Sequence, residues 1–223
     1  MSDSTQGSPG LSPAKFHEAQ GVADWRVTGS GPQAVFRATS LEQAASLVPH
    51  VVDAAAQFAV KADIDVRAEA VVVRLPYDEE WTIAATAPAF AAAVSEAAAA
   101  RGLHADPAAN QTVGIYVAQH SEADVRPFFL AALGYAPIGE TDAGDPLRCG
   151  PQLAFNPIAG DAPKRGRTHF DVFVPADQAK ARVEAALAAG GRLVDESHAP
   201  DWWTLASPDN HGVDIASWTD TFA

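Results

Sequence analysis

The feature that most constrains the fold of this chain is a pattern that occurs twice in its second half. Strand-forming residues at 113–118 lead into a helical stretch that ends at Gly134, and the same order recurs from 168–174 to Gly190. These two glycines lie 56 positions apart. A fixed spacing between similar segments is typical of one supersecondary unit that is used twice.

Each of the two glycines is followed by three short strand-like pieces, so each copy has the order β-α-β-β-β. In the first copy the pieces lie at 135–139, 147–150 and 152–157, and in the second at 192–196, 202–206 and 212–217. Two sheets of this kind that curl against each other leave a concave surface, where small molecules bind preferentially. The sequence therefore predicts a duplicated βαβββ domain over residues 111–223 with a small-molecule pocket.

The first half predicts a separate α+β domain over residues 11–105. Residues 1–10 are small and polar, and we expect them to be a disordered tail. The expected helices are one that Ser12 caps and Pro13 begins, one at 41–58 and one at 88–101. Ser40 and Gln43 form the capping box of the second helix, and Pro49 should bend it. The expected strands lie at 25–28, 34–38 and 70–75. Residues 106–110 are expected to be a linker. The predicted fold class is therefore α+β, in two domains.

Charge and composition narrow the range of partners. The chain has 28 acidic and 15 basic residues, a net charge of -13, whereas nucleic acid and anionic membranes attract Lys and Arg. No apolar stretch is long enough to cross a membrane, and the single cysteine, Cys149, excludes an intramolecular disulfide. We therefore expect a cytoplasmic protein that binds a small molecule and neither nucleic acid nor membrane. A homodimer is left open.

Two motifs in the second half carry a family resemblance. Residues 167–174 contain an R-x-H-x-D-x-x-V strand, and residues 203–210 contain a W-x-L-x-S-P-D-N turn. Together with the duplicated unit, these motifs resemble the glyoxalase-like branch of the vicinal oxygen chelate superfamily over residues 111–218. Two positions depart from the family pattern, because Ser207 stands where Asp is usual and Asp209 where glycine is common.

The resemblance implies four metal ligands, two from each copy, around one divalent ion. By position, His169 and Asp214 correspond to the second pair and Asn156 to one member of the first. The last position falls at 111–113, which holds no histidine. An Asn carbonyl is a weak ligand and Asp is shorter than Glu, so this set suits zinc, nickel or iron poorly. We therefore predict no bound metal and no cofactor.

Strand alternation extends the predicted ligand-binding face. Asp171 shares a face with His169, and one of the adjacent Trp202 and Trp203 must point to the cavity side. The predicted ligand-binding residues are His169, Asp171, Asp214, Asn156, Trp202 and Trp203. The alternative is purely structural: a strand histidine bonded to Asp171, an exposed Asp214, and tryptophans that only fill the core.

A second resemblance covers the first half of the chain. Residues 11–12, 25–27, 35–37, 40–44, 63–67 and 71–75 are similar to the framework of pterin-4a-carbinolamine dehydratase. The resemblance implies a His-His-Pro triplet and a later histidine as the catalytic groups. This chain has Val60, Lys61 and Ala62 at the triplet and Asp78 at the later position. Because the dehydration needs a group that exchanges protons near neutral pH, we expect no dehydratase activity.

The sequence therefore favours a small-molecule-binding protein, or a metal-independent enzyme of unassigned reaction, that acts through the glyoxalase-like pocket. The N-terminal domain is then a non-catalytic scaffold. The alternatives are a 4a-hydroxytetrahydrobiopterin dehydratase, a metal-dependent lyase or dioxygenase of the vicinal oxygen chelate type, and a protein whose units only mediate association. The fold alone does not decide between them.

Overall fold

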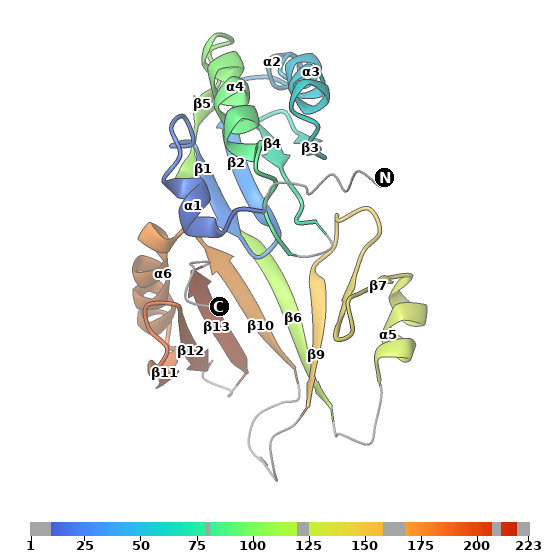
Figure 1. The fold of residues 1–223 in the computed structure, drawn as a ribbon. Helices are drawn as coiled ribbons and strands as arrows, with labels where there is room; N and C mark the ends of the chain where they lie inside the picture. Colours follow the sequence, from blue (N-terminus) through green and yellow to red (C-terminus); the bar gives the residue numbers. More distant parts are fainter. Residues whose placement is uncertain (1–9, 79–80, 120–124, 158–167, 207–210, 218–223) are drawn as a thin grey trace. The chain divides into compact units, whose positions relative to one another are not determined.

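The computed structural model divides the chain into two compact units, residues 1–110 with 219–223, and residues 111–218 (Figure 1). It describes residues 10–78, 81–119, 125–157, 168–206 and 211–217. The expected disordered tail lies almost wholly outside these residues. The two units are described separately below and are called the first unit and the second unit.

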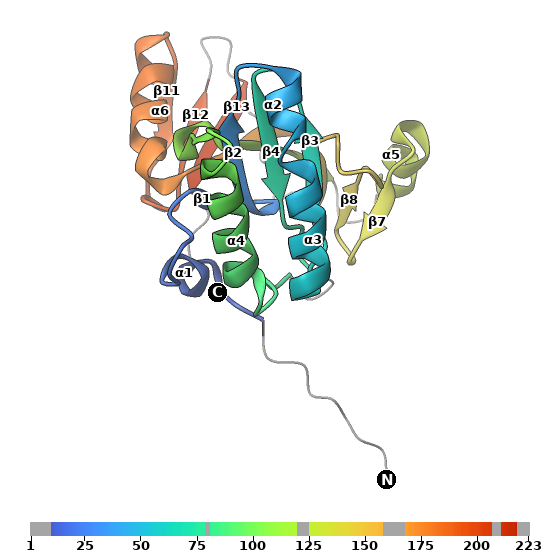
Figure 2. The ribbon, with the colours of Figure 1, turned by 90° about the horizontal axis from the view of Figure 1, so that it is seen from above.

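The first unit is built on an antiparallel sheet with the strand order β1-β2-β4-β3, and the short β5 pairs with the end of β2 on the side opposite β4. The strands are β1 (Trp25–Thr28), β2 (Gly31–Arg37), β3 (Asp63–Val66), β4 (Ala70–Arg74) and β5 (His104–Ala105). The helices are α1 (Pro13–His17), α2 (Leu41–Ala45), α3 (Val48–Phe58) and α4 (Ala87–Ala99). Figure 2 shows α3 and α4 side by side across the sheet. The core of the first unit contains large side chains that are almost fully buried: Phe16, Trp25, Phe36, Leu47 and Phe90.

The helix starts in the first unit follow from capping residues and prolines. The Ser12 side chain accepts a hydrogen bond from the Lys15 amide, and the Ser40 side chain accepts one from the Gln43 amide. The continuous helix expected at 41–58 is instead two helices, α2 and α3. Pro49 lies in the first turn of α3, where its missing N–H leaves no intrahelical hydrogen bond unmade.

Residues 106–110, which the sequence predicts to be a linker, are ordered. The Asp106 amide donates to the Val35 carbonyl at 2.8 Å, and its carboxylate pairs with Arg37 at 2.9 Å. Pro107–Ala109 then form a short 3-10 helix, and Asn110 is only 1% exposed. Backbone and side-chain contacts to β2 therefore hold this segment in place.

The second unit contains one eight-stranded sheet with the order β11-β12-β13-β10-β6-β9-β8-β7. The strands are β6 (Thr112–Gln119), β7 (Ala136–Ile138), β8 (Asp142–Gly144), β9 (Gln152–Pro157), β10 (Thr168–Val174), β11 (Arg192–Asp195), β12 (Trp202–Ala206) and β13 (Gly212–Ser217). The helices are α5 (Arg126–Leu133) and α6 (Ala176–Ala188). The order β-α-β-β-β thus occurs twice, from β6 to β9 and from β10 to β13. In each segment the first strand runs parallel to the last.

One strand expected in the second unit is replaced by a turn. Residues 147–150 do not form a strand, and β8 lies earlier, at Asp142–Gly144. The Asp145 carboxylate accepts hydrogen bonds from the amides of Leu147, Cys149 and Gly150, at 2.9, 2.9 and 3.0 Å. These bonds, first of all the one from Leu147, hold the pKa of Asp145 below its usual value. The same turn leaves Cys149 exposed.

Both helices of the second unit pack on the same face of the sheet. Val174, Leu205 and Ile215 form a buried cluster with Val183 of α6, and Leu153 and Phe155 form another, against which α5 places Phe129 and Leu130. Figure 1 shows α6 beside β11 and β12 and α5 beside β7, and α5 also contacts β8. The opposite face carries neither of these helices, and we call it the helix-free face.

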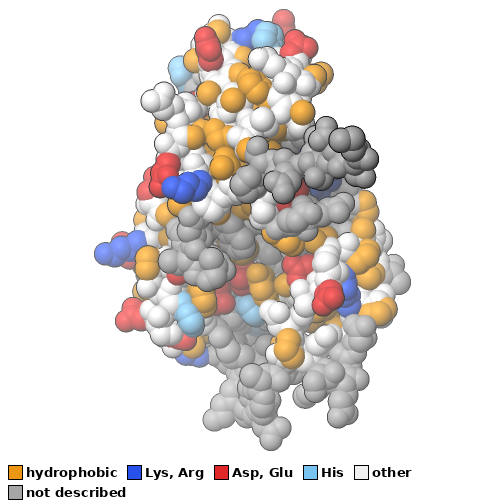
Figure 3. Space-filling view, in the orientation of Figure 1, with side chains coloured by type: hydrophobic (Ala, Val, Ile, Leu, Met, Phe, Trp, Pro, Cys, Tyr) orange, Lys and Arg blue, Asp and Glu red, His pale blue; other side chains and the backbone are white. Residues whose placement is uncertain are grey.

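The surface of the described residues carries no broad basic region in the view drawn. In Figure 3, Lys and Arg side chains form small separate groups among acidic and apolar ones. Within the described part of the chain, no helix combines the length and the apolar character that a membrane span requires.

The packing under α6 gives a stability test with a matched control. Leu205 is 3% exposed within the α6 cluster, whereas Leu147 in the Asp145 turn is 77% exposed. We expect Leu205→Ala to lower the unfolding free energy of the second unit by about 3 kcal/mol, through lost burial and the cavity that remains. Leu147→Ala should change it by less than about 0.5 kcal/mol. Hydrogen exchange in peptides from β12 and β13 measures the change in unfolding free energy in each variant. Equal destabilisation by the two substitutions would contradict this packing.

Candidate functional site

Strand register places three titratable side chains on the helix-free face. Val172 and Ile215 pack with the α6 cluster, so their neighbours Asp171 and Asp214 point to the other side of the sheet. β10 and β13 are parallel and in register, with Asp171 directly beside Asp214. His169, two residues before Asp171, lies on the same face.

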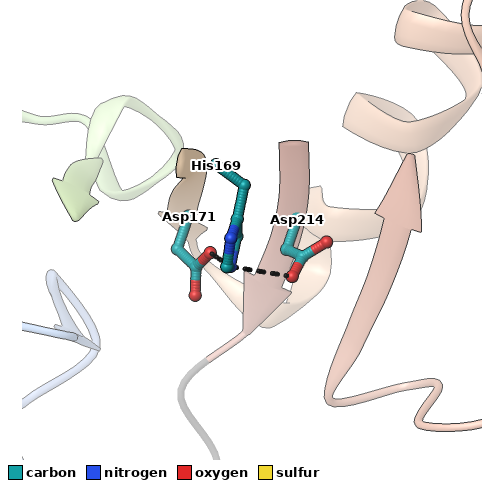
Figure 4. Close-up of side chains that lie close together, drawn as sticks. All are labelled: His169, Asp171 and Asp214. Carbon is teal, nitrogen blue, oxygen red and sulfur yellow. Dashed lines mark ion pairs between the residues drawn. The ribbon is translucent and has the colours of Figure 1, made fainter. Parts of the chain in front are cut away.

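The three side chains lie close together. His169 Nε2 is 3.3 Å from Asp171 Oδ1 and 3.6 Å from Asp214 Oδ2, and Figure 4 shows the imidazole between the two carboxylates. The carboxylate side chains are only 14% and 15% exposed, and the imidazole is 33% exposed. Two carboxylates at one ring nitrogen favour the forms of His169 that carry a proton on Nε2.

A fourth residue, Tyr116, joins this group from the first βαβββ segment. Tyr116 on β6 is the register partner of His169, and the two rings stack with centroids 5.2 Å apart and planes at 29°. Burial first, and then the negative charge of Asp171, Asp142 and Asp214, raises the pKa of Tyr116 far above its ordinary value. Its phenol is therefore protonated at neutral pH and offers a hydrogen-bond donor beside the imidazole.

Gly114 lies beside the rings of Tyr116 and Phe173, where an added Cβ atom would make ordinary van der Waals contacts. Gly114 is the register partner of Asp171, and a Cβ atom at this position would lie 3.4 Å from Tyr116 Cε2 and 3.6 Å from Phe173 Cε2. On the neighbouring strands, the side-chain amide of Gln152 donates a hydrogen bond to the Asp142 carboxylate at 2.7 Å. Asp142 belongs to the same face, because Ala154 is the register partner of both Asp142 and Tyr116.

The two adjacent tryptophans point to opposite sides of the sheet. Trp203 packs with the α6 cluster and therefore does not line the helix-free face, contrary to its place in the predicted set. Trp202 is the register partner of Ala216, which in turn pairs with Phe173, so Trp202 does lie on that face. Its ring stacks on His198 with centroids 3.9 Å apart.

The positions predicted in the first segment do not join the cluster. Asn156 is exposed near the end of β9, two residues beyond the row that contains Ala154 and Tyr116. The Gln111 side chain accepts a hydrogen bond from Arg182 at 2.7 Å, and Val113 lies on the helix side of the sheet. Arg167 and the turn at 207–210, which belong to the motifs, lie outside the described residues.

The donor set does not fit the four-ligand metal site that the family resemblance implies. His169, Asp171 and Asp214 place three ligand atoms within 4.8 Å of one another, and all three come from the second segment. The described positions of β6 and β9 on this face are Thr112, Gly114, Tyr116, Ala118, Gln152, Ala154 and Asn156, which offer no imidazole or carboxylate. One imidazole and two carboxylates alone suit a hard cation better than zinc or nickel.

Sequence comparison identifies the class of domain to which this face belongs. Residues 114–216 match the glyoxalase-like domain family, so the chain contains a glyoxalase-like domain within its second unit. No protein of curated function matches the chain.

Two solved structures are similar to part of the chain. One is a glyoxalase/bleomycin resistance protein/dioxygenase superfamily member from Vibrio splendidus 12B01, with 17% identity, a TM-score of 0.34, and coverage of 48% of this chain and 99% of that one. The other is described as an NAD-dependent benzaldehyde dehydrogenase from Legionella pneumophila, with 16% identity, a TM-score of 0.36, and coverage of 49% and 100%. Neither similarity indicates what this chain binds or whether it catalyses a reaction.

The surroundings of Tyr116 predict an unusual alkaline titration. The chain has three tyrosines, and we expect Tyr116 to lose its proton last, because burial and nearby carboxylates disfavour the phenolate. The folded state favours the protonated phenol. Its contribution to the unfolding free energy is therefore fully present at neutral pH and is lost only as the pH rises above the ordinary pKa of tyrosine. Ultraviolet titration should show that Tyr116→Phe removes the last step and Tyr135→Phe retains it. Loss of an earlier step in Tyr116→Phe would contradict this environment.

Proposed function

We propose that the second unit binds a small polar molecule on its helix-free face, either as a binding protein or as a metal-independent enzyme. The observation that carries the proposal is the imidazole of His169 between two largely buried carboxylates. Removing carboxylates from water is costly unless they gain partners. Such groups are therefore found mostly where binding or proton transfer requires them.

The chemistry of the group supports an orienting role. The carboxylates accept hydrogen bonds, the Tyr116 phenol donates or accepts one, and the imidazole supplies an N–H toward the carboxylates. Polar groups fixed on adjacent strands, together with the aromatic side chains of Phe173 and Trp202, match the usual make-up of a small-molecule site. The glyoxalase-like domain assignment is consistent with this role.

We also propose that the two βαβββ segments are copies of one unit and that the first unit is a dehydratase-like scaffold without catalytic function. In support of the second point, the segments that carry the dehydratase resemblance lie at the N-cap of α1 and on β1, β2, α2, β3 and β4. Asp78, at the position of the later histidine, accepts hydrogen bonds from the Thr82 amide and hydroxyl, both at 2.6 Å. Its carboxylate is thus engaged by Thr82. A cytoplasmic location and a homodimer remain part of this proposal.

A metal-dependent lyase or dioxygenase is the second candidate function. It is favoured by the proximity of three potential ligand atoms at His169, Asp171 and Asp214. Elemental analysis of the purified protein separates the two candidates. Our proposal expects less than stoichiometric transition metal, whereas about one tightly held ion per chain, lost in His169→Ala, would support the metal-dependent candidate.

Fragment binding tests the proposed site. In a screen of small polar fragments by amide chemical shifts, we expect the bound fragments to perturb β10 and β13. His169→Ala and Asp214→Asn should each weaken binding about tenfold, the equivalent of one lost charge-assisted hydrogen bond. His104→Ala, an exposed histidine of the first unit, is the matched control and should leave affinity unchanged. If His169→Ala lowered only the melting temperature, the cluster would be structural.

A second assay tests the scaffold role of the first unit. We expect the protein not to accelerate dehydration of 4a-hydroxytetrahydrobiopterin, because Val60 and Ala62 cannot transfer a proton and Asp78 is bound to Thr82. Lys61, the remaining residue of the triplet, is exposed and should not replace a histidine. A rate well above the uncatalysed one that disappears in Lys61→Ala would overturn this assignment.

A further inference from the structure

The charged groups of the helix-free face are mainly acidic near its centre. Among the described residues, two carboxylates lie there, at Asp171 and Asp214, with His169 as the only base beside them, and a third, Asp142, lies on the same face on β8, three strands from β10. Register with Ala206 also places Arg192 on this face, but Arg192 belongs to the edge strand β11, three strands away from β10. Asp195 accompanies it on the same strand. The centre of the face therefore attracts positive charge.

One carboxylate oxygen in this group is poorly satisfied. Asp171 Oδ1 is buried and lies 3.3 Å from His169 Nε2, yet it accepts no hydrogen bond from any of the described residues. An ion pair without a hydrogen bond compensates a buried carboxylate only partly. A ligand N–H that approached Asp171 would supply the missing donor. This oxygen points to a ligand independently of the number of acidic residues.

Aromatic rings share the face with the carboxylates. Tyr116 stacks on His169, and Phe173 and Trp202 occupy the row on the other side of Asp171 and Asp214. Flat apolar groups pack against such rings, and cations are attracted to their faces. Carboxylates between aromatic side chains form a common environment for organic ammonium groups.

We propose that the helix-free face takes an organic cation, an amine or amidine carried on a flat apolar group, with its N–H groups directed to Asp171 and Asp214. This inference rests on the proposed function, because it names the ligand class of the same site. Burial is the main cause of the raised pKa of Tyr116, and the smaller contributions of Asp171, Asp142 and Asp214 agree with a negative potential at this surface. An anionic ligand meets the same potential as repulsion.

Three probes of similar shape and different charge test the ligand class. Benzylammonium, benzyl alcohol and phenylacetate are titrated into the full chain at neutral pH and low salt, while amide and imidazole resonances are followed. We expect benzylammonium to perturb His169 and the amides of β10 and β13, and to bind about tenfold more tightly than benzyl alcohol. Phenylacetate should bind most weakly. Added salt should weaken the binding of benzylammonium only.

Charge-neutral variants locate the cation. Asp171→Asn and Asp214→Asn should each reduce the affinity for benzylammonium several-fold while leaving that for benzyl alcohol nearly unchanged. Asp195→Asn is the matched control, because this exposed carboxylate lies on the edge strand and accepts a hydrogen bond from the Ser197 amide. If either central variant fails to fold, the salt dependence and the probe ranking in the unmodified protein still decide the question.

The outcomes separate this inference from the proposed function. Equal binding of all three probes at β10 and β13 would overturn the cation preference but support the site. Tighter binding of phenylacetate, or of benzylammonium outside the second unit, would also overturn the inference, as would no binding by any probe. Titration with Mn²⁺ forms a separate arm. Strong broadening of the His169 resonances at equimolar metal, without benzylammonium binding, would overturn the inference in favour of an inorganic cation.

Discussion

The antiparallel pairing of β6 with β10 joins the two βαβββ segments of the second unit into one sheet, and the site depends on its register. This register sets Tyr116 opposite His169 and Gly114 opposite Asp171. Side chains of paired residues share a face, so a phenol from one segment meets an imidazole and carboxylates from the other. A slip of one residue would turn the carboxylates toward the helices and expose the apolar partners of α6.

The two faces of this sheet divide stability and chemistry between them. On one face, Leu205, Ile215 and Val174 are nearly fully buried beneath α6 and supply the apolar burial that stabilises the unit. On the other face, Asp171 and Asp214 are also mostly buried, although burial opposes their charge. A structural role alone would be served as well by apolar residues at those positions. The buried carboxylates at these two positions therefore support our proposal that a ligand binds to this face.

Local sequence patterns were sufficient for much of the fold but not for the complete site. Strands at 152–157, 168–174, 202–206 and 212–217 were predicted with their observed bounds, because alternation of apolar and polar residues is a local signal. The turn at 147–150 was missed because it depends on the Asp145 carboxylate and not on local β-propensity. Tyr116 was missed because its proximity to His169 requires the pairing of two distant strands. The orientations of Trp202 and Trp203 likewise required the register of β12.

The arrangement of His169 bears on whether this face only binds a ligand or also transforms it. Both carboxylates approach Nε2, so a proton on that nitrogen is stabilised and is not readily given to a ligand. Proton transfer by this residue would then involve Nδ1, as in triads where a carboxylate fixes one imidazole nitrogen and the other acts as the base. Catalysis therefore requires a ligand that reaches Nδ1, because burial and the nearby carboxylates keep the proton on the Tyr116 phenol. Binding requires only the donors and acceptors that the strands already hold in place, and it is the function that the geometry supports most directly.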